Sequence, residues 1–308
     1  MSFGARFLAF PDLFPARRAG EPWGDRGVAL DLPGGPYLVS GLSVRQEAAA
    51  HERFGALCSA AWGSAPAGIQ SRLFTAPAAD FLPLDTRGWE YAMDFDHDER
   101  SVRLAGLHLM ARLDWAPALG GALWTSEERE LFPGIFENLL RVLVAYRLVE
   151  LGGAVLHSAG VTDGDGAFLF LGPSGAGKTT LSRLSEAAGR TVLSDDLNAL
   201  LPGPGPGRAQ VVKLPFTGDL GERREGSPPR PLRGLLQLAK GPEDALQPLS
   251  SGAALALLFT CSPFVNADPL RRERLLDILA GLAAAAPARV LTFSLAGDFW
   301  SILSKAFS

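Results

Sequence analysis

One glycine-rich stretch in the middle of the chain carries the residues best suited to binding phosphate. Four residues separate Gly172 from Gly177-Lys178-Thr179, which is the spacing G-x-x-x-x-G-K-[ST] of a phosphate-binding loop. Glycines let such a loop direct several backbone N–H groups to one centre, and the helix that follows adds the partial positive charge of its N-terminus. The pattern predicts a nucleotide site and does not name the reaction. The expected phosphate-binding residues are Gly172, Pro173, Ser174, Gly175, Ala176, Gly177, Lys178, Thr179 and Thr180.

The chemistry expected of this stretch also needs a divalent cation and a base. The Lys178 ammonium should reach the β- and γ-phosphates, and the Thr179 hydroxyl should bind Mg²⁺. Two adjacent acidic residues, Asp195 and Asp196, end a predicted strand that begins at Thr191. Because neighbours on a strand point to opposite faces, we expect one carboxylate to bind Mg²⁺ and the other to face a substrate hydroxyl. A turn with two solvated carboxylates is the alternative.

A histidine lies on the strand expected beside the one that leads into the loop. The strand Ala154–Val161 carries His157, and the tight turn Asp163–Gly166 joins it to the strand Phe168–Leu171. We therefore expect His157 close to the bound phosphates. A functional role and a buried role with a backbone partner both stay open for this side chain.

The elements around these residues alternate between strands and helices, which is typical of an α/β fold. The stretch Phe168–Leu171 is short and apolar, as expected of a strand buried on both faces. A charged segment without periodicity, Gly218–Pro231, is expected to be a long loop, either a lid over the site or a solvated linker. Further strands are expected at Ala209–Leu214, Leu232–Ala239 and Arg289–Leu295, and helices at Pro133–Glu150, Ser250–Thr260, Pro269–Ala285 and Asp298–Ala306.

The N-terminal part of the chain has a different character. Residues 1–36 are rich in Pro, Gly and Arg, and we expect them to be irregular except for one short strand at Val28–Leu30. A helix is expected over Arg45–Ala61, and a hairpin is expected from the strands Trp89–Phe95 and Ser101–Leu109. The sequence therefore predicts a smaller α+β region over residues 1–125 and a phosphate-loop domain over residues 126–308.

Composition and charge exclude several classes of protein. Of the 308 residues, 47% are hydrophobic and 20% are charged, so the chain can bury a normal core. The formal net charge of −4 gives no general attraction to nucleic acid or to an anionic membrane. Only two cysteines occur and the first residues lack a signal-peptide pattern, so we expect a cytoplasmic location. The longest apolar stretch, Ala253–Cys261, is too short to cross a bilayer.

The combination of His157, the glycine-rich loop, Asp195-Asp196 and Arg233-Gly234 resembles the pattern of the HPr kinase/phosphorylase family. The nucleotide core of that family is related to ATP-dependent phosphoenolpyruvate carboxykinase. The chain looks most like the divergent HPr-kinase-related proteins found beside peptide-modification genes, some of which phosphorylate a serine of a ribosomal peptide. The resemblance covers about residues 150–300 and implies an α/β nucleotide core of this type, with the N-terminal region outside the match.

The resemblance implies a role for each site residue. The loop Gly172–Thr180 would hold the phosphates of ATP. Asp195 would take the proton from the attacking hydroxyl, and His157 would lie beside that carboxylate. Arg233 would lie near the edge of the site or near the phosphoryl acceptor. The implied metal ligands are Thr179 and Asp196, and the implied catalytic residues are Asp195, His157, Lys178, Asp196 and Arg233.

The implied activity is an ATP- and Mg²⁺-dependent serine kinase that acts on a peptide or small protein. The N-terminal region is expected to select or present this acceptor. A small-molecule kinase, an ATPase and a nucleotide-binding partner protein without turnover stay open as alternatives, and so does the formation of a homo-oligomer. The family commonly has a Glu shortly before its Arg-Gly, where this chain has Pro231-Leu232, so a second metal ligand and the phosphorylase reaction also stay open.

Overall fold

The computed structural model describes residues 22–59, 68–77, 93–106, 109–127, 131–216, 218–221, 227–295 and 297–307. These residues form two mixed β-sheets and six α-helices, so the predicted α/β class is confirmed. The chain divides into two compact units, Met1–Leu143 and Val144–Ser308, and the division lies within helix α4 (Phe132–Glu150). The domain boundary expected after residue 125 stays a prediction.

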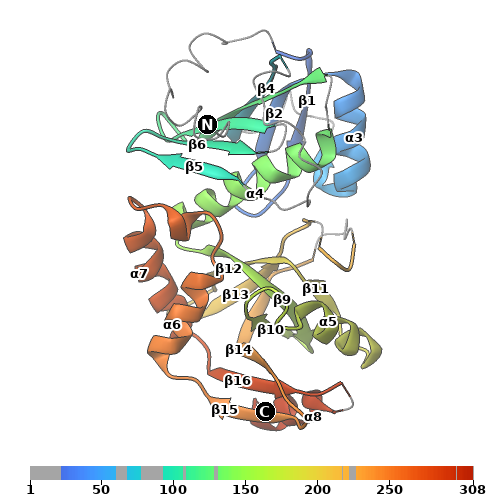
Figure 1. The fold of residues 1–308 in the computed structure, drawn as a ribbon, viewed down its shortest axis with the longest axis vertical. Coiled ribbons are helices and arrows are strands. Elements are labelled where there is room, and N and C mark those ends of the chain that lie inside the picture. The colour runs from blue at the N-terminus through green and yellow to red at the C-terminus, as the bar shows by residue number, and fades with distance from the viewer. Residues whose placement is uncertain are drawn as a thin grey trace. The chain divides into compact units, whose positions relative to one another are not determined.

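The first unit is built on a sheet whose eight described strands follow the order β3-β1-β2-β4-β8-β7-β6-β5 (Figure 1). Strands β2, β4 and β8 run parallel to one another, and the other neighbouring strands pair antiparallel. Helix α3 (Val44–Phe54) contacts β1 and β2. The strands are β1 (Arg26–Leu30), β2 (Tyr37–Leu42), β3 (Cys58–Ser59), β4 (Ile69–Thr75), β5 (Asp94–His97), β6 (Ser101–Gly106), β7 (Leu109–Asp114) and β8 (Gly120–Thr125).

Helix α3 is shorter than the helix expected over Arg45–Ala61. A capping box fixes its start, because the Ser43 hydroxyl accepts from the Gln46 N–H and the Gln46 side chain accepts from the Ser43 N–H. Its last residue is Phe54, because Gly55 adopts a positive φ of 54° and opens a short 3₁₀ turn before β3. The expectation of helix beyond Phe54 is therefore wrong, and residues 60 and 61 lie outside the described part of the chain.

The hairpin expected in this unit is confirmed where it is described. Strands β5 and β6 pair antiparallel, with Asp94 opposite Ala105 and His97 opposite Val102. The first strand was expected to begin at Trp89, and residues 78–92 lie outside the described part. The second was expected to reach Leu109, whereas β6 ends at Gly106 and residues 107 and 108 are again not described.

The second unit contains a strongly curved sheet. Pairings run from β10 through β9, β12 and β13 to β14, and β14 pairs back to β10 in parallel, so these five strands close on themselves. Strand β16 extends the sheet parallel to β14, and β15 pairs antiparallel with β16. The strands are β9 (Ala154–Asp163), β10 (Gly166–Leu171), β11 (Val192–Ser194), β12 (Leu197–Pro202), β13 (Ala209–Lys213), β14 (Arg230–Lys240), β15 (Ala245–Pro248) and β16 (Ala288–Phe293).

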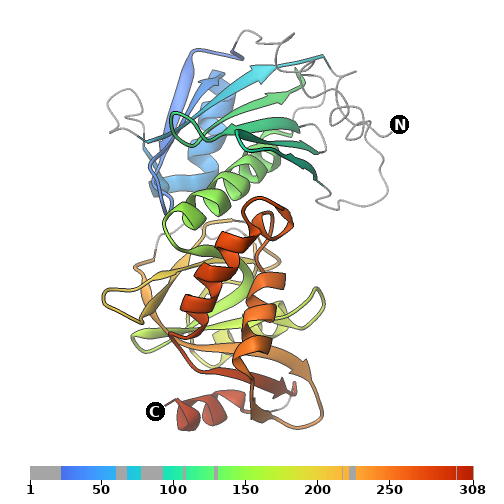
Figure 2. The ribbon, with the colours of Figure 1, turned by 90° about the vertical axis from the view of Figure 1, so that its left-hand side faces the viewer.

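The helices of the second unit agree closely with those expected. Helices α6 and α7 pack against each other, and Figure 2 shows them side by side. Buried aromatic rings of β10, β16 and α8 form one cluster, in which Phe168 and Phe170 contact Trp300. Strands β12 and β15 were not expected. The helices are α5 (Lys178–Ala187), α6 (Ser251–Thr260), α7 (Arg272–Ala283) and α8 (Phe299–Ala306), with a 3₁₀ turn at Val265–Ala267.

Among the described helices, none combines the length and the apolar character that a membrane crossing requires.

Candidate functional site

The glycine-rich loop connects the end of β10 to the start of α5, as expected. Gly175 and Gly177 adopt positive φ angles of 76° and 104°, a region that side chains other than glycine rarely enter. Gly177 is the residue before the helix, and its carbonyl accepts the first helical hydrogen bond, from Leu181 N at 2.8 Å. The N-terminus of α5 therefore faces the loop, and its backbone N–H groups are placed as an anion site requires.

Lys178 lies folded into this loop rather than in solvent. Its side chain is 7% exposed, and Nζ donates to the carbonyls of Gly172 at 3.1 Å and Pro173 at 3.3 Å. Burial lowers the pKa of Lys178, whereas Cys261 and three nearby carboxylates oppose this shift by favouring the charged ammonium. An ammonium has three donors, so one N–H of Lys178 can still reach a ligand.

Asp195 and Asp196 do not lie on a strand. Strand β11 ends at Ser194, and the two aspartates occupy a bend before β12 begins at Leu197. The Ser194 hydroxyl holds this bend by accepting from the backbone N–H groups of Asp196 at 3.2 Å and Leu197 at 3.3 Å. The prediction of a strand through Asp196 is therefore wrong, and strand alternation is not what separates the two side chains.

The Asp195 carboxylate is the least accessible acidic group of the site. It is 5% exposed; its Oδ1 accepts from Leu220 N at 3.5 Å, and its Oδ2 has no hydrogen-bond partner among the described residues. An unpartnered buried carboxylate oxygen is costly, and a bound ligand or cation at this oxygen would remove that cost.

Asp196 has different surroundings. Its Oδ1 lies 3.4 Å from His157 Nε2, and both side chains are partly exposed. The backbone joins the two segments, because Ser158 N, next to His157, donates to Asp196 O at 2.9 Å. His157 N itself donates to Cys261 O at 2.7 Å. The structure thus brings His157 to the acidic pair, as expected, but beside Asp196 rather than beside Asp195.

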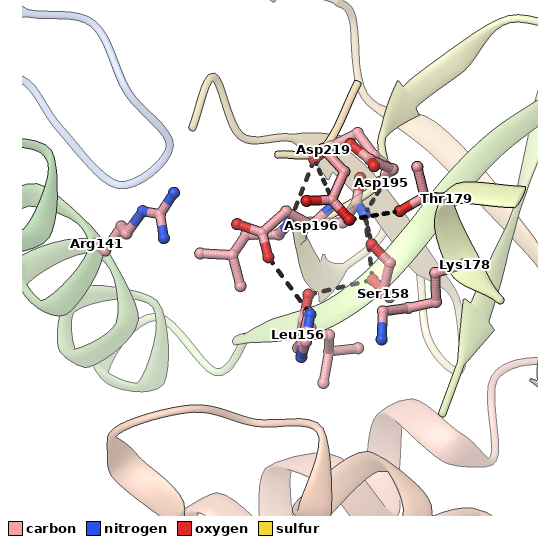
Figure 3. A network of polar contacts seen from close by, with 12 residues as sticks. Arg141, Leu156, Ser158, Lys178, Thr179, Asp195, Asp196 and Asp219 are labelled. Atoms are coloured by element: carbon pink, nitrogen blue, oxygen red, sulfur yellow. Dashed lines mark hydrogen bonds and ion pairs between the residues drawn. The ribbon is translucent and has the colours of Figure 1, made fainter. Parts of the chain in front are cut away.

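A third carboxylate, Asp219, completes the group and was not singled out from the sequence. Its Oδ2 accepts from the Thr179 hydroxyl at 3.0 Å, across 40 positions of sequence (Figure 3). The segment Gly218–Gly221 closes as a turn with Gly221 N donating to Gly218 O at 3.0 Å. The sequence signal was weak, because this Asp lies between two glycines in a segment expected to be a loop. Residues 222–226 of that loop lie outside the described part.

The buried side-chain amide of Asn198 links β12 to β9 beside the acidic bend. Asn198 is fully buried, and its Nδ2 donates to the Ser158 carbonyl at 2.8 Å and to the Ser158 hydroxyl at 3.2 Å. Ser158 also lies next to His157 on β9, and its hydroxyl donates to Leu156 O at 3.1 Å (Figure 3). This bond network fixes the bend at Asp195 and Asp196 relative to the histidine strand.

Arg233 does not join the other expected site residues. The β10–β14 register places it between the partners of Ala167 and Phe168, at the opposite end of β10 from the loop. There it pairs with Asp163 at 3.5 Å and donates to the Phe307 carbonyl. The structure does not bring Arg233 to the other residues of this site, and the expectation that it lies near the phosphoryl acceptor stays a prediction.

No protein-family model matches this chain, and no curated protein matches it.

Proposed function

We propose that this protein is an ATP- and Mg²⁺-dependent kinase, and that it transfers a phosphoryl group to the hydroxyl of a serine in a peptide or small protein. The observation that carries the proposal is the meeting of Lys178 at the glycine-rich loop with three carboxylates, one of which keeps a buried unpartnered oxygen. The order of motifs along the chain adds support for a core of the HPr kinase type. A cytoplasmic location belongs to the same proposal.

The side chains present suit the groups that the reaction needs. Mg²⁺ prefers oxygen ligands and usually combines one or two carboxylates with phosphate oxygens and water. The Thr179 hydroxyl and the carboxylates beside it provide such oxygens. Among the described residues no three His, Cys, Asp or Glu side chains are grouped to hold a metal by themselves. In this reaction Mg²⁺ would neutralise the charge that develops on the phosphates.

The protein's own groups would hold and orient the nucleotide. The N–H groups of the loop and of the first turn of α5 would donate to the phosphate oxygens, and the remaining N–H of Lys178 would donate to the transferred group. Two carbonyls of the loop already hold the Lys178 ammonium at the proposed phosphate site.

The surroundings of the two aspartates favour a division of roles opposite to the one that the family resemblance implied. Asp196 is partly exposed and has His157 beside it, so we assign it the proton of the attacking serine hydroxyl. As the serine oxygen bonds to the γ-phosphorus, this proton would pass to the Asp196 carboxylate and ADP would leave. Asp195 is buried against the turn that carries Asp219, so we assign it to the metal side.

The experiment is incubation with ATP, Mg²⁺ and serine-containing candidate peptides, followed by mass spectrometry. A peptide that gains the mass of one phosphoryl group supports the proposal. ATP turnover that releases phosphate without a modified peptide favours the ATPase, and a modified metabolite favours the small-molecule kinase. Nucleotide binding without turnover would indicate a partner protein and contradict the proposal. The Asp165→Asn variant is a suitable control, because this side chain lies at the exposed turn between β9 and β10.

A further inference from the structure

The hydrogen bond between Thr179 and Asp219 fixes the direction of the Thr179 hydroxyl proton, and this direction matters for binding a cation. A threonine hydroxyl has one proton and two lone pairs, so it can face a cation with a lone pair only when its proton points to another acceptor. Asp219 Oδ2 lies 3.0 Å from Thr179 Oγ1, and an ionised carboxylate can only accept. This contact therefore directs the hydroxyl proton to Asp219 and leaves the lone pairs of Thr179 Oγ1 available to a cation.

The position of Asp219 is tied to the other acidic groups. The turn Gly218–Gly221 carries it, and the neighbouring Leu220 N–H donates to Asp195 Oδ1 at 3.5 Å. Gly218 lies so close to Asp195 that a Cβ at this position would overlap Asp195 Oδ1. Asp195 thus contacts both chain neighbours of Asp219, although the two acidic residues are 24 positions apart (219 − 195).

An independent observation indicates that a ligand belongs in this place. Asp195 is 5% exposed, and its Oδ2 has no hydrogen-bond partner among the described residues. In Figure 3 the side chains of Thr179, Asp195 and Asp219 lie close together, above Lys178 in this view. Asp195 and Asp219 each favour the charged form of the Lys178 ammonium, so both carboxylates lie within electrostatic range of the lysine of the glycine-rich loop.

We propose that Asp219 is a positioning residue of the metal–nucleotide site, which orients Thr179 and, with Asp195, supplies the negative charge that draws in a divalent cation beside the phosphates. This inference rests on the proposed nucleotide binding and deepens it. It predicts that metal-bound and metal-free nucleotide respond to Asp219 in opposite directions. The carboxylate repels bare phosphates and attracts the cation that accompanies them.

The test uses the full chain, the non-hydrolysable analogue AMP-PNP and Mn²⁺. Titration calorimetry measures AMP-PNP affinity with and without Mn²⁺, and electron paramagnetic resonance measures the Mn²⁺ bound in the ternary complex. Asp219→Ala removes both the charge and the acceptor, whereas Asp219→Asn removes the charge and keeps an acceptor for Thr179. Asp165→Asn, at the exposed turn between β9 and β10, is the matched control.

We expect Asp219→Ala to weaken Mn²⁺ binding in the ternary complex by about 10–100-fold, the usual effect of removing a partner of a metal ligand. Asp219→Asn should have a smaller effect, and Asp165→Asn none. Metal-free AMP-PNP should bind both Asp219 variants at least as tightly as it binds the wild type. A residue that only stabilised the turn would weaken both kinds of binding together, so a parallel loss would overturn the inference.

A double-mutant cycle separates the pathway through Thr179 from a general charge effect. In a Thr179→Val background no hydroxyl needs orienting, so the Asp219→Ala change should cost less Mn²⁺ affinity than it costs in the wild type. Full additivity would refute the orienting role. If wild type binds AMP-PNP and Mn²⁺ but Asp219→Ala matches it, only the inference fails. If wild type binds no AMP-PNP under either condition, the proposed function itself fails.

Discussion

The two positive-φ glycines of the loop give a stability prediction that can be worked from the structure. A methyl group at Gly175 would meet no atom within 4 Å, whereas one at Gly177 would lie 2.8 Å from Phe293 Cζ. Both substitutions to Ala impose left-handed backbone strain of about 1–2 kcal/mol. Only Gly177→Ala adds overpacking, because Phe293 is 5% exposed and packs edge-on against Phe299.

The extra cost of overpacking a buried ring is about 1–3 kcal/mol. For a unit of this size each kcal/mol lowers Tm by about 2–4 °C, so Gly177→Ala should melt about 2–12 °C below Gly175→Ala. Calorimetry of the nucleotide-free proteins measures this difference. Gly252→Ala, in the exposed first turn of α6 with no atom within 4 Å, is the control, and it should not lower Tm.

Equal melting temperatures for Gly175→Ala and Gly177→Ala would refute the reasoning, because the contact with Phe293 would then carry no cost. A loss of stability in Gly252→Ala would show that the Gly to Ala change itself, rather than the loop geometry, lowers Tm.

Three further predictions concern the charged groups. Burial lowers the pKa of Lys178, so as the pH is raised the folded protein releases this proton at a lower pH than the unfolded chain does. The free energy of unfolding should therefore rise with pH between the lowered pKa of Lys178 and the ordinary lysine pKa. Lys178→Met should remove that rise, which urea titrations at several pH values can measure. The same variant should lose AMP-PNP binding without a lower Tm. Asp196→Asn should lower the transfer rate by about 10²–10⁴-fold with no rescue by Mg²⁺, whereas Asp195→Asn should raise the Mg²⁺ concentration for half-maximal rate. The opposite pattern would restore the assignment that the family resemblance implied. Arg233→Ala should lower Tm through its lost contact with Asp163 and leave nucleotide affinity unchanged, and a change in affinity would contradict its placement.

The glycine-rich loop and its flanking elements could be predicted because they depend on local signals. A short apolar run, a glycine spacing and an amphipathic helix follow one another without a gap, and β10 and α5 form where these signals place them. His157 could also be placed, because the hairpin turn after β9 fixes its strand beside β10.

One expectation failed at a local turn, and the other two differences arose where long-range pairing decides the outcome. Asp195 and Asp196 followed a strand-like run, but Ser194 accepts from the next backbone N–H groups and turns the chain into β12. Arg233 seemed suited to the site by its order in the family pattern, whereas the parallel register of β14 on β10 places it at the far end. Asp219 reaches Thr179 from a turn that contacts Asp195. Both contacts join residues far apart in the sequence, so no local pattern predicts them.

The most direct test of the proposed kinase follows the γ-phosphoryl group itself. ATP carrying a heavy-oxygen-labelled γ-phosphoryl group is incubated with Mg²⁺, a serine-peptide library and the wild type, Lys178→Met or Asp165→Asn. We expect labelled phosphoserine from the wild type and from Asp165→Asn, and none from Lys178→Met. Label that appears only in free phosphate, or labelled peptide formed equally well by Lys178→Met, would contradict phosphoryl transfer to serine at this loop.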